Sequence, residues 1–182
     1  MTTGRRGEWH EWPFEPIEVF RTLGRYGVEY VLLGGLAAVL QGSPLPTYDI
    51  DIAPAPGEDN LARLHAALVE IGATQIGHEE GAAGMISPTA GGTYSSSSGY
   101  IDVHPTPAGF PSYAAVLRNA RHLQLEPGLS LLAAPVRDII VSRLAAGDQR
   151  QLPALEAVLE VERAQQRSLA VKSAPAQVVR GM

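Results

Sequence analysis

The chain has 182 residues, 45% of them hydrophobic, and a formal net charge of -5. This size fits one folded domain, or one domain with a small helical appendage, and the composition excludes a disordered chain. The acidic balance excludes binding of nucleic acid through an overall basic field, so such a partner would need a local basic patch. The absence of cysteine excludes disulfides and thiolate metal sites.

The N-terminal half alternates between patterns typical of helices and of strands. The expected segments are a loose arm over 1–12, a helix from 13–15 to Gly24 or Gly27, a strand over 28–33, a short helix over 36–41, a strand over 47–53, a helix from Asp59 to Gly72 and a short strand over 74–76. Pro16 fits the first turn of its helix. We expect Asp59 to be the N-cap of the third helix, whose apolar residues recur every three or four positions.

The C-terminal half begins with a segment rich in glycine, alanine and serine. The expected segments are a mobile loop over 78–99 with one weak strand near Thr93 and Tyr94, a strand over 100–104, a helix over 113–119, a hairpin of 123–125 and 129–131, a helix from Pro135 to Gly147 and a helix from Pro153 to about Gln166. This order predicts an α+β fold with a core over 13–134, C-terminal helices over 135–167 and a flexible tail over 168–182.

Location is predicted from what the sequence does not contain. No apolar segment follows Arg5 and Arg6, so we expect no secretory signal. Its apolar runs are far shorter than the ~20 residues that cross a bilayer. We therefore expect a cytoplasmic protein with no membrane partner.

Three aspartates lie on two of the predicted strands. Asp49 and Asp51 are two positions apart, so both carboxylates should point to the same face of their strand. Asp102 stands between Ile101 and Val103 on a later strand. Carboxylates that converge in this way suit a hard divalent cation such as Mg²⁺, and phosphoryl-transfer sites hold metal ions with such groups. The alternative is that Asp49 and Asp51 lie on an ordinary exposed strand face.

Gly34 and Gly35 end one predicted strand and open a short helix. Glycines let a phosphate approach the backbone, and the start of a helix offers free N–H groups. The alternative is a tight turn that glycine fills for steric reasons alone. The combination of strand, Gly-Gly, short helix, Asp-x-Asp strand and later Asp is more specific than any one of its parts.

This combination resembles a known family. The segment from Gly34 to Pro44, followed by the segment from Thr47 to Ile52, is similar to the signature of minimal nucleotidyltransferases of the DNA polymerase β superfamily, in particular the AbiE-like toxin branch. The resemblance covers roughly residues 14–160 and is weak over 78–98. It implies the polymerase β-like fold, a small mixed sheet flanked by helices with a C-terminal helical part.

The resemblance also implies roles for individual residues. Gly34 and Gly35 would bind the triphosphate, Asp49 and Asp51 would hold Mg²⁺ or Mn²⁺, and Asp102 would complete the metal site and help to activate the acceptor hydroxyl. The expected activity is transfer of a nucleoside monophosphate from an NTP to a hydroxyl of RNA, such as a tRNA 3′ end, or of protein. A toxin of this branch would also have an antitoxin protein as partner.

The chain departs from the family pattern in its cations. No Lys or Arg occurs between Tyr26 and Ala62, and arginines replace the late lysines of the family. Arg143 and Arg150 are therefore the candidate triphosphate contacts, with exposure to solvent as the alternative. These departures favour a second hypothesis, a catalytically impaired protein that binds a nucleotide or a protein partner. A metal-dependent hydrolase is a third hypothesis, although no residue stands out to activate a water.

Thr47 and His104 are further candidates. Thr47 shares the strand parity of Asp49 and Asp51, so it could contact the nucleotide or be phosphorylated. The simpler interpretation is a threonine that opens a strand. His104 shares the face of Asp102 and could pair with that carboxylate or with substrate, but a lone histidine beside Pro105 is more often merely packed.

Overall fold

A computed structural model describes residues 14–77 and 91–173. Its first seven elements are α1 (Pro16–Arg25), β1 (Tyr30–Leu32), α2 (Gly34–Leu40), β2 (Asp49–Pro54), α3 (Glu58–Glu70), β3 (Thr74–Gln75) and β4 (Gly92–Ser96). The remaining six are β5 (Gly99–Val103), α4 (Tyr113–Leu117), β6 (Arg121–Glu126), β7 (Leu129–Ala133), α5 (Val136–Ala145) and α6 (Leu152–Ser173). The expected arm over 1–12 lies outside the described residues.

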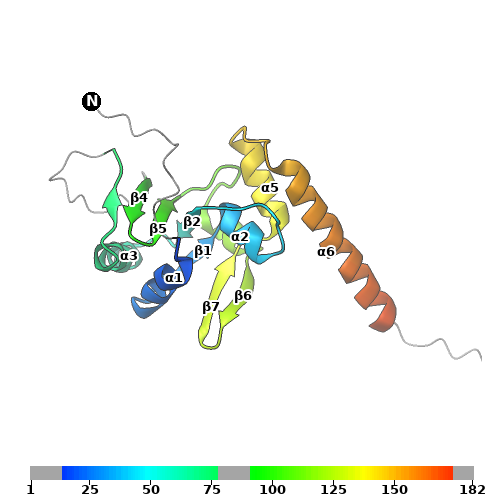
Figure 1. The fold of residues 1–182 in the computed structure, drawn as a ribbon, viewed down its shortest axis with the longest axis horizontal. Coiled ribbons are helices and arrows are strands. Elements are labelled where there is room, and N and C mark those ends of the chain that lie inside the picture. The colour runs from blue at the N-terminus through cyan, green and yellow to red at the C-terminus, as the bar shows by residue number, and fades with distance from the viewer. Residues whose placement is uncertain (1–13, 78–90, 174–182) are drawn as a thin grey trace, which may run out of the picture.

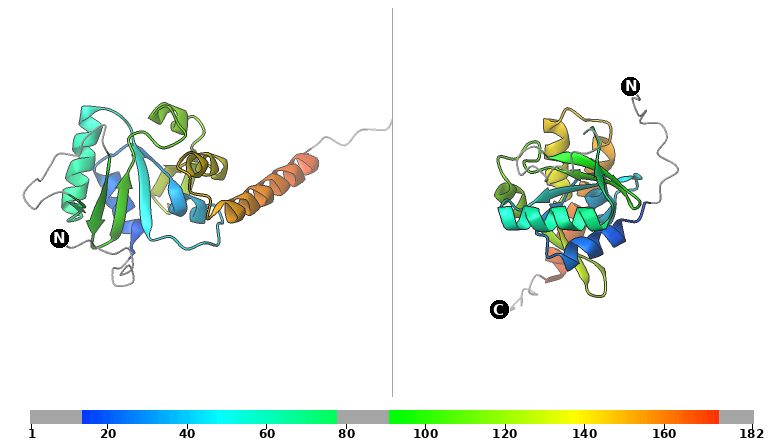
Figure 2. Two further views of the ribbon diagram at one scale, coloured as in Figure 1. Left: turned by 90° about the horizontal axis from the view of Figure 1, so that it is seen from above. Right: turned by 90° about the vertical axis from the view of Figure 1, so that its left-hand side faces the viewer.

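The strands form one mixed sheet of seven, in the order β3-β4-β5-β2-β1-β7-β6. Neighbouring strands β2 and β5 are parallel, as are β1 and β7, and the other pairs are antiparallel. Helices α1 and α3 contact each other, while α2 contacts β2 and α5 (Figures 1 and 2). The structure confirms the predicted α+β class, with a mixed sheet flanked by helices and a C-terminal helical part.

The core fills the space between the sheet and its helices. Alternation along the strands buries Ile50 and Ile52 of β2 and Ile101 of β5, which are 0% exposed. Phe20 and Leu23 of α1 pack into the same cluster from the helical side. Because the apolar residues of β2 and β5 face this core, the aspartates between them must point to the opposite face.

Helix α6 begins against the body and then leaves it. Leu155 and Val158 are buried near its start, where α6 contacts α5. Farther along, Val161 is 56% exposed, and the helix projects away from the sheet (Figure 1). None of the described helices is both long and apolar enough to cross a membrane.

The structure corrects three local expectations. Asp59 is not the N-cap of its helix: α3 begins at Glu58 and Gly57 is the N-cap, so Asp59 lies in the first turn. The weak strand expected near Thr93 and Tyr94 is confirmed as β4, but β4 is longer than expected and pairs along its length with β5; residues 78–90 of the expected loop lie outside the described residues. Helix α6 continues to Ser173, beyond its expected end near Gln166 and into the segment expected to be a tail.

Candidate active site

The three aspartates lie on the neighbouring strands β2 and β5, with Asp49 and Asp51 in the first half of β2 and Asp102 near the end of β5. The parallel register places Asp51 opposite Asp102, so these side chains leave the sheet on one face, on strands about 4.8 Å apart. Backbone hydrogen bonds extend this register, since the His104 N–H donates to the Ile52 carbonyl at 2.8 Å. Asp49 lies two positions before Asp51 and shares its face.

Asp51, Asp102 and His104 form a compact cluster. One potential ligand atom from each of them lies within 4.8 Å of the other two. The His104 Nε2 and an Asp51 oxygen are 3.0 Å apart. This hydrogen bond, together with the negative charge of Asp51, raises the pKa of His104 above its ordinary value, although burial opposes the shift.

Asp102 is a partly buried carboxylate of the cluster. Burial raises its pKa, while a hydrogen bond from Thr93 on the neighbouring strand β4 opposes the change and the charge of Asp51 adds to it. Its Oδ1 is buried and has no hydrogen-bond partner among the described residues. A buried carboxylate oxygen without a donor is costly, so this atom is a candidate ligand for a cation.

Asp49 is held by a different neighbour. The Thr47 hydroxyl donates to Asp49 Oδ1 at 2.6 Å. Thr47 also packs against Gly35, where an added Cβ would lie 2.6 Å from the Thr47 hydroxyl oxygen. Thr47 therefore orients Asp49, and Gly35 leaves the space that this contact needs.

Gly34 occupies a similar place beside Asp51. Its φ of 63° lies in the left-handed region, and an added Cβ would stand 1.8 Å from Asp51 Oδ2. Steric reasons alone are therefore enough to explain Gly34 and Gly35, because each glycine makes room for a side chain of the site, Asp51 or Thr47. Gly34 also lines the pocket in front of Asp51.

A pocket of about 240 Å³ opens over these residues. It is lined by Asp49, Asp51 and His104 on one side and by Ser142, Arg143 and Asp148 of the α5 end on the other. Arg143 is the only Lys or Arg among the described residues that line it. A second pocket of about 250 Å³ shares His104 with the first and is also lined by Thr93, Asp102 and Thr106.

The two candidate arginines differ in position. Arg143 is 20% exposed and donates to Asp148 at 2.8 Å, inside the pocket. Arg150 is 89% exposed and donates to the same carboxylate at 3.0 Å, but it does not line the pocket. The structure therefore brings Asp49, Asp51, His104, Gly34 and Arg143 around one pocket and leaves Arg150 outside it.

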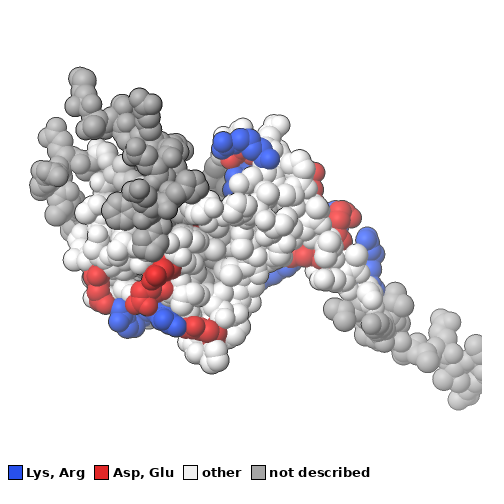
Figure 3. All heavy atoms as spheres, in the orientation of Figure 1, with Lys and Arg blue, Asp and Glu red and all other residues white. Residues whose placement is uncertain are grey.

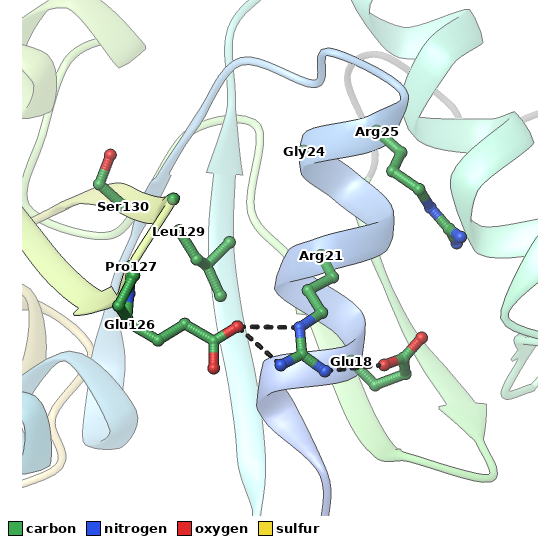
Figure 4. Close-up of a pocket in the computed structure, with 9 residues that line it drawn as sticks. Glu18, Arg21, Gly24, Arg25, Glu126, Pro127, Leu129 and Ser130 are labelled. Carbon is green, nitrogen blue, oxygen red and sulfur yellow. Dashed lines mark hydrogen bonds and ion pairs between the residues drawn. The ribbon is translucent and has the colours of Figure 1, made fainter.

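A larger hollow lies elsewhere, between α1 and the β6–β7 turn (Figure 4). Arg21 is already paired with Glu126 at 2.7 Å and with Glu18 at 3.5 Å. Arg25 is paired with Glu70, on α3. Since its cations have carboxylate partners and it holds no cluster of metal-binding groups among the described residues, this hollow is not the candidate active site.

Comparisons with known proteins add two structural similarities. No protein-family model and no protein of curated function matches the chain. One similar solved structure, from Thermotoga maritima, is provisionally named a nucleotidyltransferase; the two are 13% identical, the match covers 90% of this chain and 96% of that chain, and the TM-score is 0.47. Another is the antibiotic-resistance factor ANT(2'')-Ia, with 14% identity, coverage of 86% and 94%, and a TM-score of 0.48. Similarities this distant do not establish a family, so function is argued from the site residues.

Proposed function

We propose that the chain is a nucleotidyltransferase dependent on Mg²⁺ or Mn²⁺, which moves a nucleoside monophosphate from an NTP to an acceptor hydroxyl. The observation that carries the proposal is the meeting of Asp51, Asp102 and His104 within 4.8 Å at the edge of a pocket that also holds Asp49 and Arg143. Negative groups on one wall and a guanidinium on the other suit a metal-bound polyphosphate.

The donor atoms fit a hard divalent cation. Asp51 and Asp102 are neighbours in register, and two like charges at this spacing repel unless a cation lies between them. The unpartnered Asp102 oxygen is the atom that most needs such a ligand. We assign Asp49, Asp51 and Asp102 to the ion, with His104 positioning Asp51. When bound, the ion would neutralise charge on the phosphate oxygens.

The reaction balances without a further reactant. The acceptor oxygen forms a bond to the α-phosphorus of the NTP, the bond from that phosphorus to the bridging oxygen breaks, and pyrophosphate leaves. Asp102 is the group we assign to accept the hydroxyl proton, as the AbiE-like resemblance implies, because it belongs to the same cluster as Asp51 and His104. Arg143 would contact the phosphates from the α5 side, and Gly34 would leave them space.

Transfer of label from an α-³²P NTP to an acceptor tests the proposal. Asp49→Ala and Asp51→Ala should each lower transfer by at least about a hundredfold, as loss of groups that organise a phosphoryl-transfer site does. Asp59→Ala, which removes an exposed aspartate of α3, should leave transfer unchanged. Unchanged transfer in folded Asp51→Ala protein would contradict the assignment.

The acceptor is tested in the same experiment. RNA binding depends on cations that reach phosphates. Most arginines of the described residues are instead paired with carboxylates. Figure 3 shows charges of both signs in small mixed groups. Parallel incubations with tRNA and with a mixture of proteins separate the two proposed acceptors. The toxin role implied by the AbiE-like resemblance predicts that expression slows growth and that Asp51→Ala removes this effect.

A second candidate function is nucleotide binding without catalysis. It is favoured by the presence of one cation, Arg143, among the described residues that line the pocket. It predicts that Mg²⁺ with NTP raises the melting temperature while no label is transferred to any acceptor. Measured turnover would exclude it.

A further inference from the structure

The turn after α5 brings Asp148 back onto Arg143. The helix ends in a Schellman motif: Gly147 has a φ of 73°, its N–H donates to the Leu144 carbonyl, and the Asp148 N–H donates to the Arg143 carbonyl at 3.0 Å. The two positions that this motif joins usually form an apolar contact. Here they are a carboxylate and a guanidinium, and both line the candidate pocket.

Asp148 accepts from two arginines with different surroundings. One oxygen, Oδ2, takes the Arg143 donor at 2.8 Å, and Oδ1 takes the Arg150 Nε at 3.0 Å and the Arg150 backbone N–H at 3.3 Å. Arg143 is 20% exposed and Arg150 is 89% exposed. Asp148 thus links an arginine inside the pocket to one at the surface.

Each charged group of the pocket has a separate partner. Asp49 is bonded to Thr47, Asp51 to His104 and Arg143 to Asp148. An arginine that shares a pocket with two carboxylates would otherwise be drawn to them, and such a pair would occupy the oxygens that a metal ion needs. In the structure the Arg143 guanidinium instead donates to Asp148, beyond the turn after α5, at 2.8 Å.

We propose that Asp148 is a positioning residue that keeps the Arg143 guanidinium on the phosphate side of the pocket and away from the Asp49–Asp51 pair, and that Arg150 acts on Asp148 and not on the nucleotide. The inference rests on the proposed function, since it concerns the same metal and nucleotide site. It assigns a role to Asp148 in the pocket and to Arg150, which bonds to Asp148 without lining the pocket.

Binding of Mn²⁺ without nucleotide, followed by electron paramagnetic resonance, tests the proposal independently of activity. Asp148→Asn should weaken Mn²⁺ binding about tenfold, because the released guanidinium competes for the carboxylates. Adding Arg143→Gln to this variant should restore binding to within about twofold of wild type, because the competitor is gone.

The matched control is Asp148→Asn combined with Arg150→Gln. It has the same net charge as the first double variant but keeps Arg143, so it should stay weak. Equal recovery of the two double variants would show a through-space charge effect and overturn the proposal, as would unchanged Mn²⁺ binding by Asp148→Asn. Circular dichroism melts confirm that each variant is folded. If wild type binds no Mn²⁺, the proposed metal-dependent function fails, and this inference falls with it.

Discussion

Two separate constraints act on Gly34. Its φ of 63° disfavours any side chain, and a Cβ there would overlap Asp51 Oδ2 at 1.8 Å. Gly27 has the same φ of 63°, but a Cβ there would meet nothing within 4 Å. Alanine substitutions at Gly27 and Gly34 therefore distinguish two effects. Both change the backbone conformation, but only the one at Gly34 displaces the Asp51 carboxylate.

Gly34→Ala should lose metal binding and activity, whereas Gly27→Ala should lose only stability. Both variants carry the left-handed penalty of about 1–2 kcal/mol, and the overlap in Gly34→Ala adds about 1–3 kcal/mol. Urea denaturation measures the free energies of unfolding, and Mn²⁺ titration measures the site. If Gly34→Ala binds Mn²⁺ as Gly27→Ala does, the close contact with Asp51 has no functional consequence.

The shared face of the three aspartates is predictable from sequence, because alternation along a strand is a local property. The bond between His104 and Asp51 is not, since it depends on the parallel register of β2 and β5, segments about fifty positions apart. For this reason the sequence predicted that His104 is packed, or that it pairs with Asp102 or with substrate. The presence of Asp102 two positions before His104 was the available signal.

At the scale of elements, the end of α5 is stabilised by charge as well as by backbone hydrogen bonds. The hydrogen bond from Arg150, and then the charges of Arg150 and Arg143, hold the pKa of Asp148 below its ordinary value. A carboxylate with a lowered pKa in the folded state stabilises the protein above the pKa of the unfolded chain, about 3.9. That contribution is lost as pH falls through the lower folded-state pKa.

Wild type should therefore be more stable than Asp148→Asn at pH 7, and the difference should shrink as the pH falls below about 3.9 and through the lower folded-state pKa of Asp148. Urea denaturation of both proteins at pH 7 and at pH 2.5 measures it. A difference that stays the same at both values would mean that the loss comes from packing and not from the charge of Asp148.

Helix α6 provides a contrast along one element. Leu155 is 1% exposed and Val161 is 56% exposed. Leu155→Ala should cost about 2–5 kcal/mol in the free energy of unfolding, as large-to-small core changes do, and Val161→Ala should cost less than about 0.5 kcal/mol. Thermal melts compare the two. Equal losses would mean that the outer part of α6 is covered in solution.

Element boundaries show where sequence patterns stop being informative. Apolar periodicity predicted α1, α3 and α5 because it depends on near neighbours. The Gly- and Ser-rich segment of β4 has weak strand propensity and forms a strand through its pairing with β5. Asp59 has the side chain of a good N-cap, yet the N-cap of α3 lies two positions earlier, at Gly57.

At the scale of the whole molecule, the site is assembled from four elements between α2 and the end of α5. Strands β2 and β5 supply the carboxylates, the start of α2 supplies Gly34, and the end of α5 supplies Arg143 and Asp148. The α+β class followed from the order of helices and strands, whereas the strand order, including the parallel pairing of β1 with β7, depends on long-range contacts that local patterns do not encode.

A ligand that joins these parts should stabilise the fold as a unit. With 10 mM Mg²⁺ and a dissociation constant of about 1 mM, linkage adds about 1.4 kcal/mol, which raises the melting temperature by about 3–6 °C for a chain of this size. The same concentration should not stabilise Asp51→Asn or Asp102→Asn, since each lacks a carboxylate of the cluster. Melts in Mg²⁺ are compared with melts in NaCl of equal ionic strength, because screening alone changes surface charge interactions. An equal rise in wild type and in Asp102→Asn would place the bound Mg²⁺ elsewhere on this acidic protein.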